Sequence, residues 1–88
     1  LQLPTVQPDF PYLYTMQITG TITYVEVEGG FWGILGDKGI PYHPVNGIPK
    51  EFQKESLRIS AEVKPYSGVS VFMWGRLVEL VKMQALDK

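Results

Sequence analysis

The chain has 88 residues, 44% of them hydrophobic, with eight Lys or Arg against nine Asp or Glu, one histidine and no cysteine. A chain of this length buries roughly 60–65% of its unfolded surface, which supports one compact core and excludes a multi-domain protein. The lack of cysteine excludes disulfide frameworks, Cys-ligated zinc, iron–sulfur clusters and thiol catalysis. A net charge of −1 removes the simplest argument for a nucleic-acid binder.

The charges are distributed unevenly along the chain. Residues 1–37 contain four acidic side chains and no basic one, whereas residues 38–88 contain eight basic and five acidic side chains. No run of like charges occurs, so the pattern favours a surface solvated by scattered charges over a dedicated basic face.

The opening segment differs in composition from the rest. Residues 1–11 contain three prolines and no periodic apolar pattern, which predicts an extended tail ahead of a single small β-barrel domain at residues 12–88. No signal peptide or membrane-spanning stretch is apparent. Because the first residue is Leu1 rather than Met, we expect an extracytoplasmic or lipid-anchored parent more than a cytoplasmic one, although the sequence leaves the compartment open.

The first predicted element is a long strand over residues 12–28, which is rich in Thr, Ile, Val and Tyr. Its apolar positions change phase between Ile22 and Val25, which predicts a bulge or a strong bend. Gly20 offers a nearby place for the backbone to coil. Such a strand can serve two sheets at once.

Two hairpins are predicted next. A turn at Gly29 and Gly30 leads into a short apolar strand over residues 31–36, and a second turn at residues 37–39 ends with a glycine suited to positive φ. The third strand, residues 40–45, contains two prolines that cannot donate to a ladder. It is therefore predicted to be short, distorted or at an edge.

One short helix of about two turns is predicted over residues 49–55, with Pro49 at its first position and Phe52 as its anchor in the core. The alternation over residues 57–64 then predicts a half-buried strand with Leu, Ile, Ala and Val on one face. A last strand is predicted over residues 69–83, with a break at Gly75.

This element order, in which a short helix separates the third and fourth of five strands, is that of an all-β, five-stranded OB-like barrel. An SH3-like barrel accommodates five strands but explains the helix less well. An α+β arrangement, with an antiparallel sheet and one helix on its face, is the alternative.

The sequence also resembles a family of short, uncharacterised prokaryotic OB-like β-barrel domains. This resemblance covers about residues 20–81 and implies the barrel fold, with no settled activity or catalytic residue. It also adds some weight to an extracytoplasmic parent. The segments that carry it are GGFWGI at residues 29–34 after Glu28, DKG at 37–39 followed by Tyr42 and Pro44, residues 49–52 leading to Leu57, and MWG at 73–75 with VEL at 78–80.

The residues that could perform chemistry are few. His43 is the only imidazole and has no neighbour in sequence that would orient it as a base, so it is interpreted as a surface or turn histidine. Glu26, Glu28 and Asp37 are the one hint of a metal site, but three dispersed carboxylates are too few ligands for calcium. We therefore expect no enzyme, no cofactor and no metal.

The aromatic residues are the most informative feature for function. Aromatic rings on an exposed face of an OB barrel can stack on bases or sugars, although core packing explains at least half of the rings in so small a domain. The candidate ligand-binding residues combine three rings with three flanking cations: Trp32, Tyr42, Trp74, Lys38, Lys64 and Arg76.

The favoured hypothesis is a non-enzymatic binding module that recognises an extended ligand or a protein partner through an aromatic open face. A protein or glycan partner is favoured over single-stranded nucleic acid, because the net charge is low. The alternatives are an accessory domain tethered by the proline-rich tail, and a weak single-stranded nucleic-acid binder.

Overall fold

The computed structural model describes residues 15–27, 29–69 and 74–86. These residues form five β-strands and one 3-10 turn, in the order β1 (Met16–Val25), β2 (Phe31–Gly36), β3 (Pro41–Pro44), η2 (Lys50–Phe52), β4 (Arg58–Pro65) and β5 (Arg76–Ala85). The predicted tail at residues 1–11 lies outside the described residues. No helix among the described residues has the length and apolar character needed to cross a membrane.

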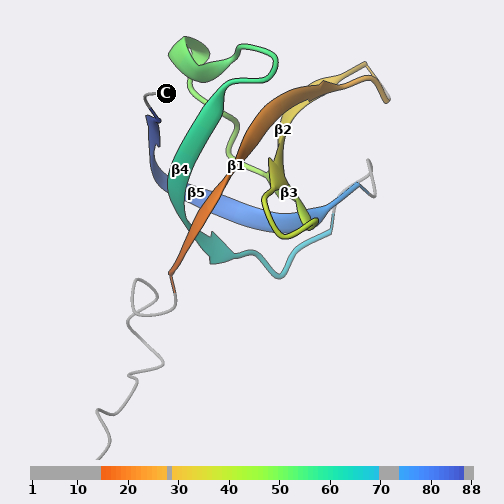
Figure 1. The fold of residues 1–88 in the computed structure, drawn as a ribbon. Coiled ribbons are helices and arrows are strands. Elements are labelled where there is room, and N and C mark those ends of the chain that lie inside the picture. The colour runs from red at the N-terminus through yellow and green to blue at the C-terminus, as the bar shows by residue number, and fades with distance from the viewer. Residues whose placement is uncertain (1–14, 28, 70–73, 87–88) are drawn as a thin grey trace, which may run out of the picture.

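The five strands close into a barrel in the order β1-β2-β3-β5-β4 (Figure 1). All neighbouring strands are antiparallel except β3 and β5, which run parallel. This confirms the prediction of an all-β, OB-like barrel. The predicted two-turn helix is wrong, because only the single 3-10 turn η2 forms there.

Strand β1 holds the barrel together by pairing with two strands in succession. Its residues 16–21 pair with β4 and its residues 20–25 pair with β2. The two halves of the strand therefore have different neighbours, but within one closed sheet rather than in two sheets. Gly20 lies in both pairings, and a Cβ there would come within 2.5 Å of the Leu35 carbonyl oxygen. The absent side chain therefore lets the two halves of the sheet close tightly at this point.

Of the two alternatives predicted between Ile22 and Val25, a bulge or a strong bend, the bulge is not present, because the pairing of β1 with β2 is continuous there. The phase change has another cause. Ile22 faces the barrel interior, whereas the buried Val25 is three residues along and faces the outside of the wall. Val25 must therefore be covered by something on the outer surface.

Strand β3 is short, as predicted, but it is not at an edge. It pairs with β2 at only two positions and with β5 at three. The two prolines restrict the ladder to these few rungs, and the parallel partner β5 closes the barrel on the other side. In the last predicted strand, the break at Gly75 is confirmed, because Gly75 has φ of +77° and β5 begins at Arg76. Val69 is exposed outside any strand, and residues 70–73 lie outside the described residues.

The interior of the barrel is filled mainly by aliphatic side chains. The five largest fully buried side chains are Ile22, Ile34, Ile59, Val63 and Val78. The alternation predicted for β4 is confirmed, because Ile59, Ala61 and Val63 are all buried. Phe52 packs against this cluster but is only partly buried, so it is a weaker anchor than expected.

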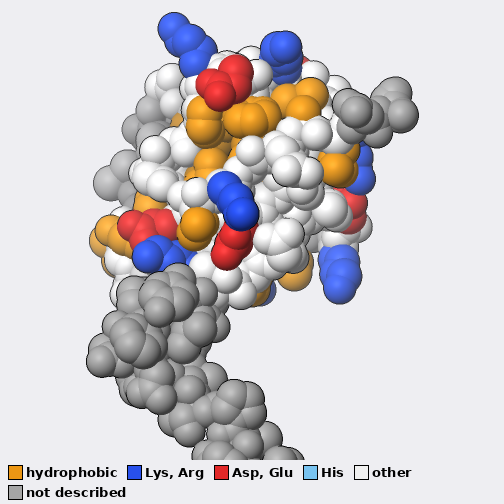
Figure 2. All heavy atoms as spheres, turned by 90° about the vertical axis from the view of Figure 1, so that its left-hand side faces the viewer, with side chains coloured by type: hydrophobic (Ala, Val, Ile, Leu, Met, Phe, Trp, Pro, Cys, Tyr) orange, Lys and Arg blue, Asp and Glu red, His pale blue; other side chains and the backbone are white. Residues whose placement is uncertain are grey.

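Charged side chains of both signs are interspersed on the face shown in Figure 2, around a band of hydrophobic side chains. Three ion pairs link described residues: Arg58 with Asp37, Lys64 with Glu79, and Lys82 with Glu62. The charges on this face are therefore scattered, as the sequence predicts.

Candidate functional site

Along β2 and β3, side chains that point outward alternate with side chains that point into the core. Ile34 and Tyr42 are cross-strand partners and both point into the barrel. Their neighbours Gly33 and His43 therefore face outward, as does Phe31 two residues along β2. The alternation of these two short strands thus brings an aromatic ring and an imidazole to the same outer face.

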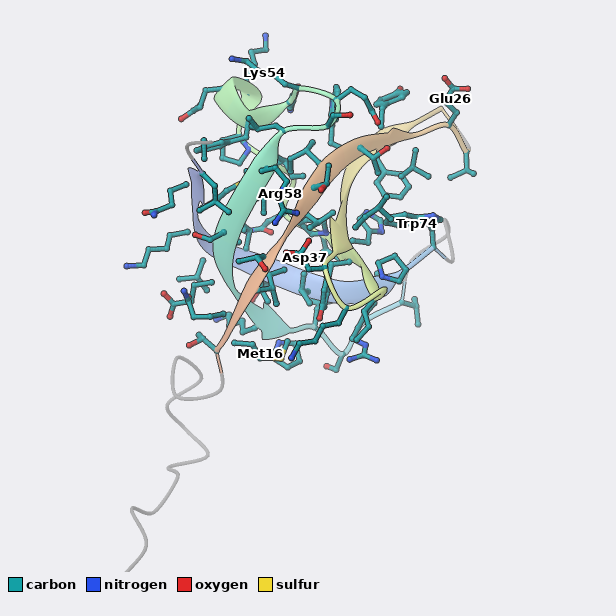
Figure 3. The ribbon with its side chains drawn as sticks, in the orientation of Figure 1. Met16, Glu26, Asp37, Lys54, Arg58 and Trp74 are labelled. Atoms are coloured by element: carbon teal, nitrogen blue, oxygen red, sulfur yellow. The ribbon has the colours of Figure 1, made fainter. Side chains whose placement is uncertain are left out.

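The rings on this surface are in direct contact. Phe31 stacks on His43 with ring centroids 4.1 Å apart and planes inclined by 25°. Trp74 meets Phe31 edge-on, with centroids 5.5 Å apart and an interplanar angle of 73°. We call Phe31, His43 and Trp74 the aromatic face; Figure 3 shows Trp74 on the outside of the barrel.

Gly33 makes room for Trp74. A Cβ on Gly33 would come within 2.6 Å of the Trp74 ring and within 3.4 Å of Val25 Cγ2. The indole therefore lies over the bare backbone of β2, next to the outward-facing Val25. This accounts for the burial of Val25 on the outer wall. The left-handed backbone at Gly75 then turns the chain from Trp74 into β5.

The three rings differ in their exposure to solvent. His43 is only 7% exposed, whereas Phe31 and Trp74 are half-buried and keep part of their surface open. The interpretation of His43 as a surface or turn histidine is therefore wrong, because it lies within β3 beneath Phe31. Burial lowers the pKa of the imidazole, since a protonated ring would lose hydration there.

A second aromatic pair lies at the end of the β1–β2 hairpin. Tyr24 and Trp32 are cross-strand partners whose rings meet edge-on, with centroids 5.1 Å apart. The Tyr24 hydroxyl donates to the Gly29 carbonyl at 3.2 Å. Trp32 is half-buried against the core cluster. It belongs to the opposite side of β2 from Phe31, so it does not extend the aromatic face.

The structure brings together only some of the predicted ring residues. Trp74 is in the aromatic face, Trp32 points to the other side of the strand, and Tyr42 is 7% exposed within the core. Tyr42 therefore offers no ring for stacking.

The three predicted cations do not form a single basic groove. Lys64 is 3.5 Å from the Glu79 carboxylate on the neighbouring strand. Lys38 is exposed on the β2–β3 hairpin, and Arg76 is exposed at the start of β5. Of the described cations, Arg76 is the nearest in sequence to Trp74. The exposed Glu26 lies on the same side of the barrel as Trp74 (Figure 3).

The Asp37 carboxylate accepts hydrogen bonds from Arg58 on β4 and Thr19 on β1; we call this group the Asp37 clamp. Arg58 donates to both of its carboxylate oxygens, at 2.6 and 2.8 Å, and the Thr19 hydroxyl donates at 2.7 Å. These hydrogen bonds lower the pKa of Asp37 to about 2. Within residues 15–27, 29–69 and 74–86, no cluster of three possible metal ligands occurs, and Glu28 is outside these ranges.

Comparisons with protein-family models, curated protein sequences and solved structures find no match for this chain. The resemblance to a prokaryotic domain family therefore stays a prediction. Two of the three residues of the aromatic face, Phe31 and His43, were not among the predicted site residues. No local signal marked them, because residues 31–36 form an apolar run without polar alternation and His43 lies in the proline-containing β3.

Proposed function

We propose that this domain is a non-enzymatic binding module that holds an extended ligand, a glycan or a polypeptide segment, across its aromatic face. The observation that carries the proposal is the contact of Phe31, His43 and Trp74 on the outside of β2 and β3. OB barrels bind oligonucleotides and oligosaccharides on the surface of these two strands, flanked by the β1–β2 and β4–β5 connections.

The arrangement of the rings suits stacking on a ligand. Phe31 stacks on His43 and meets Trp74 in a T-shaped contact, so the rings lose little conformational freedom when a ligand binds. Half-exposed rings present apolar surface on which a pyranose ring or an apolar side chain packs. A preformed platform of this kind supports binding without a large structural change.

The surrounding charges favour an uncharged ligand over a phosphate chain. On the described residues beside the face, Glu26 and Arg76 contribute one charge of each sign. A nucleic-acid backbone needs several cations along its path, and each phosphate contact adds to the salt dependence of binding. No reaction is assigned to the face, because the buried His43 lies beneath Phe31 rather than open to a substrate.

Amide chemical shifts of the labelled domain, followed by NMR during titration, test this proposal. The probes are a neutral β-linked glucose hexasaccharide, an uncharged proline-rich peptide and an oligothymidylate. We expect the hexasaccharide or the peptide to shift the amides of Phe31, Gly33 and His43, and Trp74→Ala to weaken binding at least tenfold. The matched control is Phe52→Leu, which removes a half-buried ring in η2, away from the aromatic face, and leaves the affinity at this face unchanged.

Two results would overturn the proposal. The first is the absence of shifts at these amides with both uncharged probes, which would leave an accessory role. The second is saturable oligothymidylate binding at the same amides that weakens at high salt, which would assign the face to single-stranded nucleic acid.

A further inference from the structure

The edge of β5 that faces away from β4 has hydrogen-bonding partners only along its first half. Strand β3 ends at Pro44, and the Val45 N–H donates to the Val78 carbonyl at 2.8 Å. The Asn46 side chain then acts as one more rung: its amide donates to the Leu80 carbonyl at 3.0 Å, and its carbonyl oxygen accepts from the Leu80 N–H at 2.9 Å. Beyond Leu80, neither β3 nor Asn46 reaches β5.

The direction of the backbone groups beyond Leu80 follows from the bulge in the β4–β5 pairing. Val63 pairs with Leu80 and Glu62 with Lys82, so Val81 is an extra residue that inverts the alternation. The Leu86 N–H accordingly donates to the Arg58 carbonyl on β4. By alternation, the N–H and C=O groups of Met83 and Ala85 point away from β4, and no group among the described residues bonds to them.

A hollow of about 490 Å³ lies beside this open edge, between η2 and β5. Its apolar lining includes Ile48, Phe52, Leu80 and Met83, and the exposed Val81 adds to it. Figure 2, which views the molecule from the left-hand side of Figure 1, shows a band of hydrophobic side chains on this side of the barrel. An open hydrogen-bonding edge therefore adjoins an apolar groove.

Two charged residues of opposite sign line the groove, Glu51 and Lys82. Two more lysines, Lys50 and Lys54, are exposed close in sequence to lining residues, on η2 and just after it. The Lys82 side chain is 78% exposed, and its ammonium lies 4.0 Å from the Glu62 carboxylate. The nearby Glu55 is turned toward β1, where it accepts hydrogen bonds from Thr23 and Tyr24.

We propose that the β5 edge at residues 82–85 is a docking site for an extended, acidic peptide segment of a partner protein. The segment adds a strand to the barrel by hydrogen bonding to Met83 and Ala85. Alternate apolar side chains enter the groove, and the acidic ones lie toward Lys82 and the exposed Lys50 and Lys54 at its rim. A second copy of this chain is the other possible occupant of this edge, and the experiment below distinguishes the two. This site is separate from the aromatic face.

The probe for this site is a capped hexapeptide of alternating glutamate and valine, compared with its lysine and valine counterpart. We expect only the acidic peptide to shift the amides of Met83 and Ala85 and to slow their hydrogen exchange. Ala85→Pro removes an outward N–H without removing a β4 hydrogen bond, so it should weaken binding at least tenfold. Lys82→Glu should also weaken binding severalfold, whereas Lys38→Glu on the distant hairpin should not.

Equal binding of both peptides, shifts confined to the aromatic face, or wild-type affinity in the Lys82→Glu variant would overturn the proposal. Sedimentation of the domain without peptide tests whether a second copy of the chain occupies this edge. A concentration-dependent dimer that protects the Met83 and Ala85 amides would assign the edge to a second copy instead.

Discussion

The two sides of the β2–β3 wall have different chemistry. On the inner side, the fully buried Ile34 packs in a cluster dominated by isoleucine and valine. On the outer side, Phe31, His43 and Trp74 contact one another outside that cluster. Tyr42 is the one aromatic side chain in that buried cluster among the described residues. On the outer side, Phe31 and Trp74 keep part of their ring surface open, and these are the rings that we propose for binding.

The largest expected effect comes from the inner side. Ile34→Ala removes a fully buried side chain beside Gly20 and should lower the free energy of unfolding by about 2–5 kcal/mol. Denaturant unfolding followed by tryptophan fluorescence measures this loss. A change below about 1 kcal/mol would show that the inner side is not the main source of stability.

A smaller effect is expected from acid at the outer side. Because burial lowers the pKa of His43 below 6.5, the unfolded chain takes up this proton at a higher pH than the folded one. The contribution of neutral His43 to stability is complete above pH 6.5. It falls as the pH drops from 6.5 to the folded pKa.

Unfolding curves recorded at a series of pH values between about 7 and 5 measure this slope. In the His43→Asn variant the slope over this window should disappear, since no other described group with a resolved pKa shift titrates there. A slope that persists in the variant would show that the outer-face imidazole is not its source.

The smallest effect is expected at the exposed clamp between Asp37 and Arg58. The lowered pKa of Asp37 means that its contribution to stability is present above pH 3.8 and is lost as the pH falls toward 2. Asp37→Asn should change the melting temperature little at neutral pH, because exposed ion pairs are screened by solvent. Acid titration of both proteins should show a shallower loss of stability in the variant between these two pH values.

Much of the fold could be predicted from local patterns. The bounds of β2, the alternation of β4 and the positive φ of Gly39 all follow from short segments of sequence. The interior position of β3 could not be predicted, because its parallel pairing with β5 joins segments more than thirty residues apart. The two prolines favoured an edge, and nothing local opposed that interpretation.

The candidate site was predicted less well, for a related reason. Trp74 was identified from its residue type, but whether Tyr42 or His43 faces inward depends on the register of β3 against β2. A shift of one residue exchanges the two faces of a strand. The prolines on either side of this pair obscure that alternation, so the sequence pointed to Tyr42 and missed His43.

The Gly33→Ala variant tests most directly whether the aromatic face is separate from the core. The new methyl group would meet the Trp74 ring at 2.6 Å and must displace it from Phe31. We predict that the stability changes by less than about 1 kcal/mol, whereas binding of the uncharged ligand at the face weakens at least tenfold. Unfolding by denaturant and NMR titration on the same sample give both values. Wild-type affinity, or a loss of stability as large as that of Ile34→Ala, would contradict the account.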